Sequence, residues 1–546
     1  MTRRRSVSAL LAVGLLSGCG TDSDTVFYPL SIEFDSAASS VPEGTEAASV
    51  SVRLNAPASV TVSVDYSVRD ITASGHDACN TRDYSLESGT LHFEPGATSA
   101  SLDLRHLDDD LAEIDEQLRI ELSSPEGARL GTVDQHLHTI SDDDRELLVD
   151  VRADFDAQGD GETDDTARIQ AALDRTALSS AAVLLLPPGV YQVTSLELTA
   201  GLSLYGYGAT LRQAPEQPED AQLLRVTHAA DEDSPLTLVQ GLTFDGDREA
   251  QGEFADWQYQ ESDLFAAGAT PTRAGRIVLV AEDLTFENTG GNGLLLGPNS
   301  DSTVCQLQGH EVFTDLLKLG GGNSRLEARE VAAAGSIGTT SIAITGQPQG
   351  YDARNSVEVT LEDITLADGD LEIDVRDAST VTARRVVVDE APFYLRAVRS
   401  SVRISDSSLA IGPPLYRFNR IVAPHDVRFD RSTFTLREIS ERTVTYPESD
   451  RELVLFGVTW DNVDHAFADG EPDTLVEPLS GQTLRFDDCE FRVGADVEPS
   501  DTTYVAGNAL DAGEGSDNRI VIHGGRVDPA FDAVFAPGAC DCEQTP

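Results

Sequence analysis

The sequence predicts an all-β protein in which a small antiparallel, immunoglobulin-like sandwich precedes a long solenoid of short strands. Two observations carry this prediction. Between residues 28 and 145, apolar and polar residues alternate with period two at regular spacing, which is typical of strands with one buried face. From residue 146 to about 540, short strands with apolar centres recur roughly every twenty to forty residues, the period of a solenoid whose repeats bury their apolar faces by stacking.

Residues 1–19 are expected to be a targeting segment and not part of the fold. Three arginines at residues 3–5 precede an apolar stretch, residues 7–16, that is too short to span a bilayer as a helix. The segment ends in Leu-Ser-Gly-Cys, which resembles a bacterial lipobox. The resemblance implies that Cys19 is lipidated and becomes the mature N-terminus, whereas the alternative is an ordinary cleaved signal with an incidental cysteine.

The polar residues 20–27 then serve as a tether between the lipid and the first folded unit. We therefore expect an exported protein, held to a membrane through a lipid anchor at Cys19. Its place is the bacterial cell envelope, at the outer membrane or the cell surface.

The charge of the chain is strongly negative. Its formal net charge is −55, from 39 basic and 94 acidic residues, and Lys318 is the only lysine. A phosphate backbone would be repelled, so no nucleic-acid partner is expected. Three interpretations of the acidity stay open: a solvated surface for salty surroundings, sites for divalent cations, or solubility alone.

The cysteines do not form a disulfide scaffold. The chain has six, and five remain if Cys19 carries the lipid. Export permits a disulfide, and we expect one that fastens the C-terminal tail, residues 541–546, through Cys540 or Cys542.

Carboxylates gather at the ends of the predicted strands of residues 28–145. Glu43 follows Pro42, Asp83 precedes Tyr84, and three consecutive aspartates stand at 108–110 and again at 142–144. Strand ends of a sandwich converge at its poles, where clustered carboxylates repel one another unless a cation lies between them. Calcium takes six to eight oxygen ligands in irregular geometry and suits such a pole.

These features together resemble the Calx-beta family. The matching residues are Pro42-Glu43-Gly44, Asp83-Tyr84, the Gly-Thr-Leu and Pro-Gly of residues 89–96, and the closing Ile-Ser-Asp-Asp-Asp of residues 140–144. The resemblance implies calcium at one pole, with Glu43, Asp83, Asp109, Glu113, Glu116, Asp142, Asp143 and Asp144 as ligands. Residues 75–82 depart from the pattern as an insertion with His76, Cys79 and Arg82, and a cation at Arg82 would weaken one site. The alternative is a degenerate domain whose carboxylates are merely solvated.

The second unit, residues 146–540, opens with an aspartate-rich segment in which Asp164 or Asp165 caps a helix and Ile169 and Leu173 give that helix a buried stripe. Residues 149–211 resemble the start of the pectate-lyase-3-like superfamily (rhamnogalacturonase/epimerase-like). The resemblance implies a single-stranded right-handed parallel β-helix whose open end is covered by this N-terminal capping helix. It also implies an extracellular polysaccharide as partner.

Candidate chemistry lies around the long stretch between Phe244 and Phe286. Trp257 and Tyr259 can stack on sugar rings. Carboxylates follow the apolar centres of three successive strands, and we expect them to form a ladder of catalytic candidates: Asp245, Glu287 and Asp315. Nearby candidates for holding substrate are Asn288, Asn292, His310 and Arg325, while Lys318 or Arg325 is a candidate base.

Two carboxylates that flank a glycosidic bond suffice for hydrolysis, whereas a lyase needs a base beside a uronate and a cation to neutralise it. We therefore expect a polysaccharide-acting enzyme, either a glycoside hydrolase or a polysaccharide lyase, with a calcium-binding accessory domain. The alternative is a non-catalytic, calcium-dependent adhesion or matrix-binding protein. In that case the ladder is only a set of turn aspartates that satisfy their own backbone.

Overall fold

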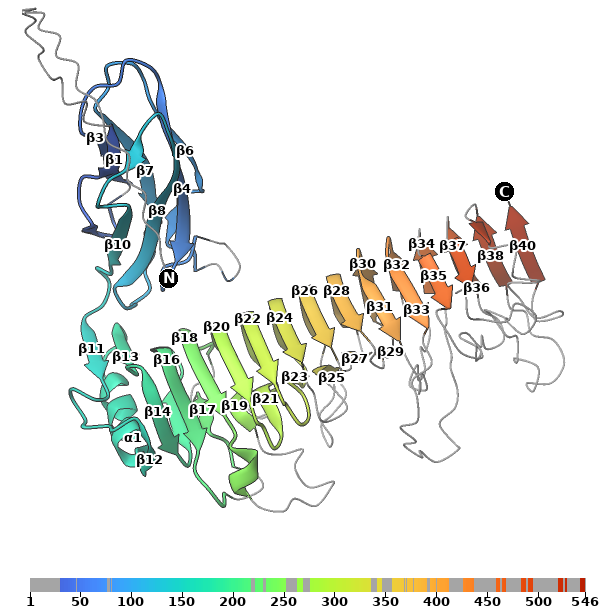
Figure 1. Ribbon diagram of the computed structural model, residues 1–546. Helices are drawn as coiled ribbons and strands as arrows, with labels where there is room; N and C mark the ends of the chain where they lie inside the picture. The colour runs from blue at the N-terminus through green and yellow to red at the C-terminus, as the bar shows by residue number, and fades with distance from the viewer. Residues whose placement is uncertain are drawn as a thin grey trace, which may run out of the picture.

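A computed structural model of the chain describes most residues from 30 to 411 and separate strands beyond them up to residue 545 (Figure 1). Residues 1–29 fall outside the described part, as do shorter stretches that include 218–220, 252–262, 269–274, 335–340 and 346–355. The predicted lipidation site Cys19, the loop residue His76, and Trp257 and Tyr259 therefore lie outside the described residues. Among the described residues, no helix has the length and apolar character needed to cross a membrane.

The first unit is a sandwich of two five-stranded sheets. One sheet has the order β5 (Tyr84–Ser85), β7 (Ser99–His106), β3 (Ala47–Leu54), β1 (Ser31–Phe34) and β9 (Arg129–Leu130). The other has the order β2 (Ala38–Pro42), β10 (Gln135–Ser141), β8 (Glu116–Glu126), β4 (Val62–Asp70) and β6 (Gly89–Phe93). Alternate side chains point inward and pack Phe34, Val64, Phe93 and Ile120 into one core, as the period-two pattern predicts.

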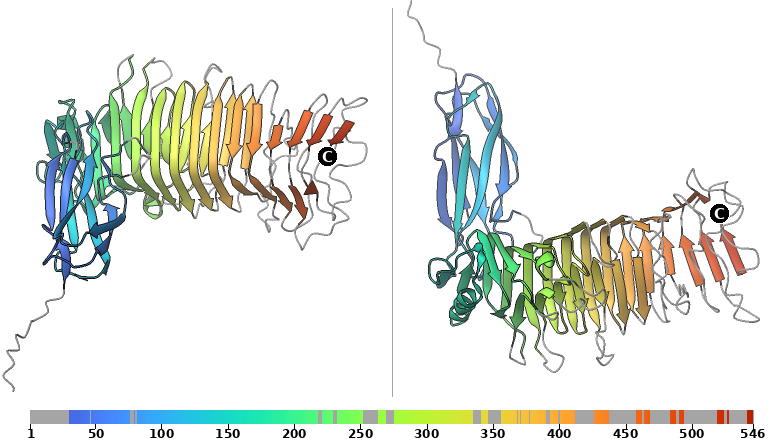
Figure 2. Two further views of the ribbon diagram at one scale, coloured as in Figure 1. Left: turned by 90° about the horizontal axis from the view of Figure 1, so that it is seen from above. Right: turned by 60° about the horizontal axis from the view of Figure 1, so that its bottom comes forward.

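The second unit is a right-handed parallel β-helix made of stacked coils (Figures 1 and 2). A 22-stranded sheet runs along it, with the strands β11 (Leu147–Asp150), β12 (Asp160–Asp164), β13 (Ala182–Leu185), β14 (Gly189–Val193), β16 (Ser203–Gln213), β18 (Leu236–Asp245), β20 (Ile277–Glu287), β22 (Ser300–His310), β24 (Ser324–Ala334), β26 (Val357–Ala367), β28 (Thr380–Asp389), β30 (Ser401–Ser405), β31 (Ser408–Ile411), β32 (Asp426–Asp430), β33 (Thr433–Leu436), β34 (Val458–Asp461), β35 (Asp464–Phe467), β36 (Thr483–Asp487), β37 (Glu490–Val493), β38 (Arg519–His523), β39 (Arg526–Val527) and β40 (Asp541–Thr545).

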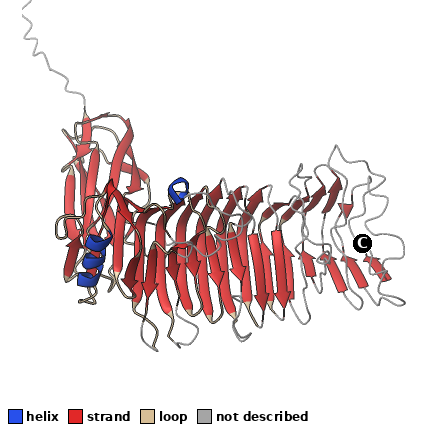
Figure 3. Cartoon of the chain, turned by 90° about the horizontal axis from the view of Figure 1, so that it is seen from below, coloured by secondary structure: helices blue, strands red, loops and turns tan. Residues whose placement is uncertain are grey.

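An eight-stranded parallel sheet forms another side of the coils between residues 196 and 398. Its strands are β15 (Leu196–Thr199), β17 (Leu224–Thr227), β19 (Asp263–Ala267), β21 (Asn292–Leu296), β23 (Leu317–Gly320), β25 (Ile342–Thr345), β27 (Leu371–Arg376) and β29 (Phe393–Val398). The cartoon of Figure 3 shows the same predominance of strands, with a short 3-10 helix, η1 (Arg248–Gln251), beside the coils.

The long strands of the 22-stranded sheet turn a corner at their middle. At that corner, residues in register adopt positive φ, among them Gly241 (73°), Asp283 (50°), Gln306 (53°) and Glu330 (55°). Only glycine adopts this conformation freely, and short polar residues tolerate it better than β-branched ones. The polar corner residues therefore mark the edge where one flat face of the β-helix ends and the next begins.

The interior of the β-helix is one continuous apolar core. Phe244 and Phe286 occupy the same register and stack with ring centroids 4.9 Å apart, and Phe265 stacks on Phe244 at 5.6 Å. Helix α1 (Thr166–Thr176) buries Ile169 and Leu173 against the first coil and so covers the open end, as the sequence predicts (Figure 1).

The two aspartates that are predicted to cap this helix accept hydrogen bonds from different parts of the backbone. Asp165 occupies the N-cap position, but its carboxylate accepts hydrogen bonds from the backbone N–H groups of Gln158 and Gly159, each at 2.9 Å. Asp164 accepts a hydrogen bond from the backbone N–H of Thr166 at 2.9 Å.

The sandwich stands on the N-terminal part of the β-helix, and covalent and polar contacts join the two units (Figures 1 and 2). A disulfide links Cys79 to Cys305 across 226 residues of sequence. The hydroxyl of Thr81 donates to Glu282 at 2.6 Å. The inserted loop that departs from the Calx-beta pattern is therefore the docking element. The expected disulfide of the C-terminal tail stays a prediction, because Cys540 and the side chain of Cys542 lie outside the described residues. The partner of Cys79 is far away in sequence and is brought close only by the docking.

One predicted strand differs from the structure. The pattern of residues 311–315 resembles a strand, but β22 ends at His310, and Glu311 takes a positive φ of 53° that turns the chain into β23. Val312 is buried inside this turn, so its apolar character reflects a corner of the coil and not a strand centre.

Candidate functional site

Polar side chains form a row at the carboxyl ends of four neighbouring strands of the β-helix. Arg212, Asp245, Glu287 and His310 are consecutive partners in the parallel register of β16, β18, β20 and β22. Register partners on adjacent parallel strands lie about 4.8 Å apart. The structure therefore brings Asp245, Glu287 and His310 of the predicted site together, and it adds Arg212 to them.

Asp245 is buried and fully engaged. Its Oδ2 accepts from Arg212 Nε at 2.8 Å, and its Oδ1 accepts from the Asn288 side-chain amide at 3.1 Å and from the backbone N–H of Asp247 at 2.9 Å. The contact with Arg212 is therefore a charge-assisted hydrogen bond.

The carboxyl group of Glu287 lies in different surroundings from that of Asp245. Burial raises the pKa of the Glu287 carboxyl, and the negative charge of Asp245 raises it further, although His310 and Arg212 act against this shift. The row thus holds two adjacent carboxyl groups in different surroundings: one is paired with an arginine, and the pKa of the other is raised.

Asp315 does not lie on this row. In the coil after Glu287 the equivalent position is His310, because the chain turns at Glu311. Asp315 instead lies just before β23, where its carboxylate contacts Lys318 Nζ at 3.0 Å and its backbone N–H donates to Asn292 at 3.2 Å. The expected ladder of three carboxylates is therefore a pair.

The second polar group is centred on Asp263 at the start of β19. Its carboxylate accepts from Asn292 at 2.8 Å and from Gln222 at 3.1 Å. Burial raises the pKa of Asp263 to about 6, while these amides and the charge of Lys318 lower it. Asn292, Asp315 and Lys318 thus belong to a largely buried network around Asp263, in which each side chain has a partner within the protein.

Arg325 lies away from both groups. It stands near the start of β24, at the opposite end of the long strand from the row, and its register partner is Asp301. With Asp301, Ser302, Thr303 and Glu327 it lines a shallow polar depression of about 250 Å³.

The carboxylates at one pole of the sandwich converge in two groups. Glu43, Asp143 and Asp144 form an outer group, and Asp83, Glu113 and Glu116 form an inner one; in each, the oxygens lie within 4.8 Å of one another. Asp109 and Asp142 lie beside them, because both raise the pKa of Glu43 through their charge. All eight predicted ligands are therefore located at this pole.

The electrostatics of the pole are those of crowded, buried acids. Burial is the largest cause that raises the pKa of Glu43 to about 8 and that of Asp83 to about 6, and it raises the pKa values of Glu113 and Glu116 well above the usual range. Glu43 Oε1 and Asp142 Oδ1 are buried and have no hydrogen-bond partner. An oxygen-only donor set with unpartnered, buried carboxylate oxygens fits a calcium ion. Arg82 does not occupy the site, since its Nε donates to the backbone carbonyl of Tyr84 at 3.0 Å.

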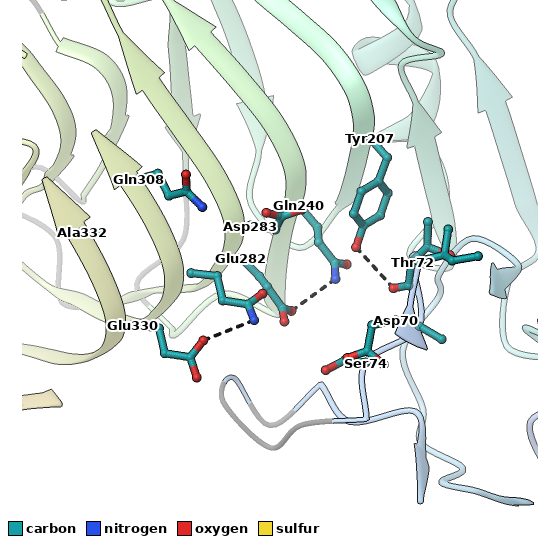
Figure 4. Close-up of a pocket in the computed structure, with 13 residues that line it drawn as sticks. Asp70, Thr72, Ser74, Tyr207, Gln240, Glu282, Asp283, Gln308, Glu330 and Ala332 are labelled. Carbon is teal, nitrogen blue, oxygen red and sulfur yellow. Dashed lines mark hydrogen bonds between the residues drawn. The ribbon is translucent and has the colours of Figure 1, made fainter. Parts of the chain in front are cut away.

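A cleft of about 380 Å³ separates the sandwich from the β-helix beside this pole (Figure 4). Gln240 donates to Glu282 at 3.2 Å, and Tyr207 donates to the carbonyl of Thr72 at 3.3 Å. Asp70, Asp283 and Glu330 add further carboxylates, and no arginine or lysine is among the described residues that line it.

Sequence reasoning missed Arg212, whereas it placed Asp263 among the carboxylates of the long stretch that could hydrogen-bond sugar hydroxyl groups. Arg212 follows the apolar Leu211 just as Asp245 follows Phe244 and Glu287 follows Phe286, so the same pattern applied one coil earlier finds it. In the structure Asp263 instead accepts hydrogen bonds from Asn292 and Gln222, which lie in other coils.

Comparisons with known proteins identify the sandwich and show what the β-helix is similar to. Residues 28–144 match the Calx-beta domain, and residues 148–232 match "Rhamnogalacturonase A/epimerase, pectate lyase-like". A comparison with curated proteins found no match.

Solved structures are similar to one unit or the other. The apo form of the Calx CBD1 domain is 30% identical and covers 21% of this chain and 100% of its own, with a TM-score of 0.20. The CBD12 structure from CALX1.2 is also 30% identical, with a TM-score of 0.20. The match covers 21% of this chain and 47% of the CBD12 chain.

A family 28 exopolygalacturonase from Yersinia enterocolitica is 12% identical and covers 94% of this chain and 98% of its own, with a TM-score of 0.41. The A-module of a mannuronan C-5 epimerase from Azotobacter vinelandii is 14% identical over 73% of this chain and 100% of its own, with a TM-score of 0.40. Over residues 28–144 the chain therefore belongs to the Calx-beta domain family, and this domain is joined to a β-helix whose first coils are similar to the rhamnogalacturonase A/epimerase, pectate lyase-like family.

Proposed function

We propose that this chain is an exported, lipid-anchored protein that acts on an extracellular polysaccharide as a glycoside hydrolase, and that its sandwich binds calcium. The observation that carries the enzymatic part is the pair Asp245 and Glu287, register neighbours of which one is paired with Arg212 while the pKa of the other is raised. The match of residues 148–232 to a family described as rhamnogalacturonase and epimerase supports a polysaccharide as substrate.

The pair has the roles that hydrolysis of a glycosidic bond requires. Glu287, whose pKa is raised, donates a proton to the leaving oxygen, and Asp245, paired with Arg212, stabilises the positive charge that develops on the sugar or attacks it. Neighbouring strands are about 4.8 Å apart, close to the roughly 5 Å separation of carboxyl groups in retaining enzymes. His310, exposed at the next position of the row, is available to hold the substrate.

A lyase mechanism has less support from the same contacts. Lys318, one of its two candidate bases, is instead engaged in an ion pair with Asp315 at 3.0 Å. Arg325 lies at the far end of the long strand from the row.

A non-catalytic adhesion protein is the second candidate, and one observation favours it. Both oxygens of Asp245 already accept hydrogen bonds within the protein, as expected for a structural carboxylate. In this alternative the polar row binds sugar hydroxyl groups without cleaving the chain.

Calcium binding by the sandwich rests on the pole. The eight carboxylates offer oxygen ligands only, and two of their oxygens are buried without a partner. A bound calcium ion neutralises the like charges that otherwise repel one another there.

Export is supported by the disulfide between Cys79 and Cys305, because such bonds persist in oxidising compartments. Anchoring rests on the lipobox-like sequence that ends at Cys19. Labelling of cells with a radioactive or clickable fatty acid tests this point, and a Cys19→Ala chain that still carries the label would contradict it.

The test of the activity is a screen of the folded chain on acidic and neutral polysaccharides, with calcium and with a chelator. New reducing ends without the absorbance of an unsaturated uronate are the expected result. Both signals together would replace the hydrolase by a lyase. Binding without any product would replace the enzyme by the adhesion protein, and neither product nor binding on any polysaccharide would overturn the proposal as a whole.

A further inference from the structure

The inner carboxylate group of the sandwich is not open to solvent, because the β-helix covers it. Glu113 and Glu116 are 5% and 4% exposed in the docked chain. The hydroxyl of Tyr205, a residue of β16 that is fully buried, donates to Glu113 Oε1 at 3.1 Å. The second unit therefore forms part of the wall of this group.

Glu282 of β20 brings a further negative charge to the same place. Its carboxylate accepts a hydrogen bond from Thr81, two residues from Asp83, at 2.6 Å. The charges of Glu282 and Glu116 influence each other although they belong to different units. Carboxylates from both sides of the junction thus face one another across a buried contact.

In their charged form, the carboxylates of such a junction repel one another unless a positive charge lies between them. Like charges in a buried place repel strongly, and each also loses its hydration. Arg145 offsets part of the charge at the edge of the pole, with Nη2 2.9 Å from Asp115 and Nε 3.8 Å from Asp142. In the neighbouring outer part of the same pole, Glu43 Oε1 and Asp142 Oδ1 are buried without a partner, and the charge of Glu43 acts on Glu113 of the inner group. The pole as a whole therefore points to a ligand that the protein itself does not supply.

We propose that the inner group is an interdomain cation site, in which a divalent cation held by Asp83, Glu113 and Glu116 locks the sandwich onto the β-helix. Tyr205 and Glu282 are positioning residues: Tyr205 orients Glu113 toward the cation, and Glu282 adds its charge from the other unit. This inference rests on the proposed binding of calcium by the sandwich.

Docking of the two units and binding of the cation are thermodynamically linked in such a site. If the cation contacts a site that exists only in the docked state, docking strengthens binding of the cation, and the cation strengthens docking by the same factor. Changes in the β-helix must then weaken calcium binding, although they leave every ligand of the sandwich in place.

The experiment is a calorimetric titration of the folded chain, freed of metal, with calcium chloride. Glu282→Gln keeps an oxygen for the Thr81 hydroxyl but loses the charge, and Tyr205→Phe loses only the donor to Glu113. The matched control is Glu358→Gln, an exposed glutamate in β26 of the same β-helix sheet. We expect Glu282→Gln to weaken the affected calcium step about tenfold, with a smaller loss for Tyr205→Phe and none for the control.

Hydrogen–deuterium exchange of the same proteins gives the reciprocal readout. Calcium should slow exchange of backbone amides in β16 and β20, and it should do so less in Glu282→Gln. Titration curves of both variants that coincide with that of the parent, together with unchanged exchange in β16 and β20, would overturn the interdomain site while leaving calcium binding intact. An absence of any calcium heat in the parent chain would instead overturn the calcium part of the proposed function, and the interdomain site with it.

Discussion

At the scale of single residues, the proposed hydrolysis depends on the groups that surround Asp245 and Glu287. Asp245 is buried against Arg212, which is about one third exposed. Loss of that arginine leaves a buried carboxylate with only its amide and backbone donors. The row is therefore a structural element of the coil as well as a candidate site.

We expect Arg212→Gln to lower the free energy of unfolding by about 1–3 kcal/mol, because an uncompensated buried charge is costly and partial exposure reduces that cost. Chemical denaturation of the variant and of Arg225→Gln, which changes an exposed arginine in β17, measures the difference. Equal losses in the free energy of unfolding of the two variants would contradict a stabilising role for the ion pair between Arg212 and Asp245.

Much of this row could be predicted at residue scale, and the reason is local. A polar residue directly after the apolar centre of each strand is visible in the sequence at Asp245 and Glu287, and parallel stacking then fixes the alignment. The sequence pattern predicts Asp315 on this row because Val312 and Phe313 resemble a strand centre, whereas the chain in fact turns at Glu311. A buried corner and a strand centre have the same apolar signature in one sequence.

At the scale of elements, a chain of buried histidines ties the edge strand β2 to the rest of the sandwich. His106 Nδ1 donates to the carbonyl of Thr45 at 3.0 Å, so its Nε2 accepts from His138 Nε2–H at 2.9 Å. His138 Nδ1 then accepts from the hydroxyl of Ser39 in β2 at 2.7 Å. This pattern needs a neutral His138, and burial lowers its pKa to about 4.

A folded pKa of about 4 against an ordinary value of 6.5 means that the unfolded chain binds more protons between these pH values. The contribution of His138 to stability is therefore present at neutral pH and is lost as the pH falls from 6.5 toward 4. Relative to His138→Gln, we expect the parent to lose on the order of 1–3 kcal/mol between pH 7 and pH 4.5.

Urea unfolding at both pH values measures this change, and His92→Gln, which alters an exposed histidine in β6, serves as control. A difference between parent and His138→Gln that stays constant with pH would contradict the neutral assignment. The sequence places His136 and His138 on one strand face, but it gives no sign of His106, because β7 meets β10 only in the folded sandwich.

At the scale of the whole molecule, the docking of the two units is the feature that the sequence conceals most. The Calx-beta pattern predicts the pole, and the repeats predict the β-helix, yet neither indicates that the pole faces Tyr205 and Glu282. The inserted loop with Cys79 is the only local sign, and its meaning depends on Cys305, 226 residues later.

The disulfide should contribute to this docking. Closing so long a loop removes much entropy from the unfolded chain, with an upper value of about 5 kcal/mol. We expect the double variant Cys79→Ser, Cys305→Ser to unfold several degrees lower in calorimetry, and to gain no further sensitivity to reductant. A reductant that lowers the melting temperature of the variant as much as that of the parent would show that other cysteines carry the effect.

The central claim is that Glu287 acts as the acid in cleavage of a polysaccharide. The most direct test compares the rate at which new reducing ends appear with the parent chain, with Glu287→Gln and with the matched control Glu358→Gln on the substrate that the screen identifies. Since general acid catalysis contributes roughly 10²–10⁴-fold, we expect a loss of that size for Glu287→Gln and an unchanged rate for the control. A Glu287→Gln chain that releases reducing ends as fast as the parent would contradict the account.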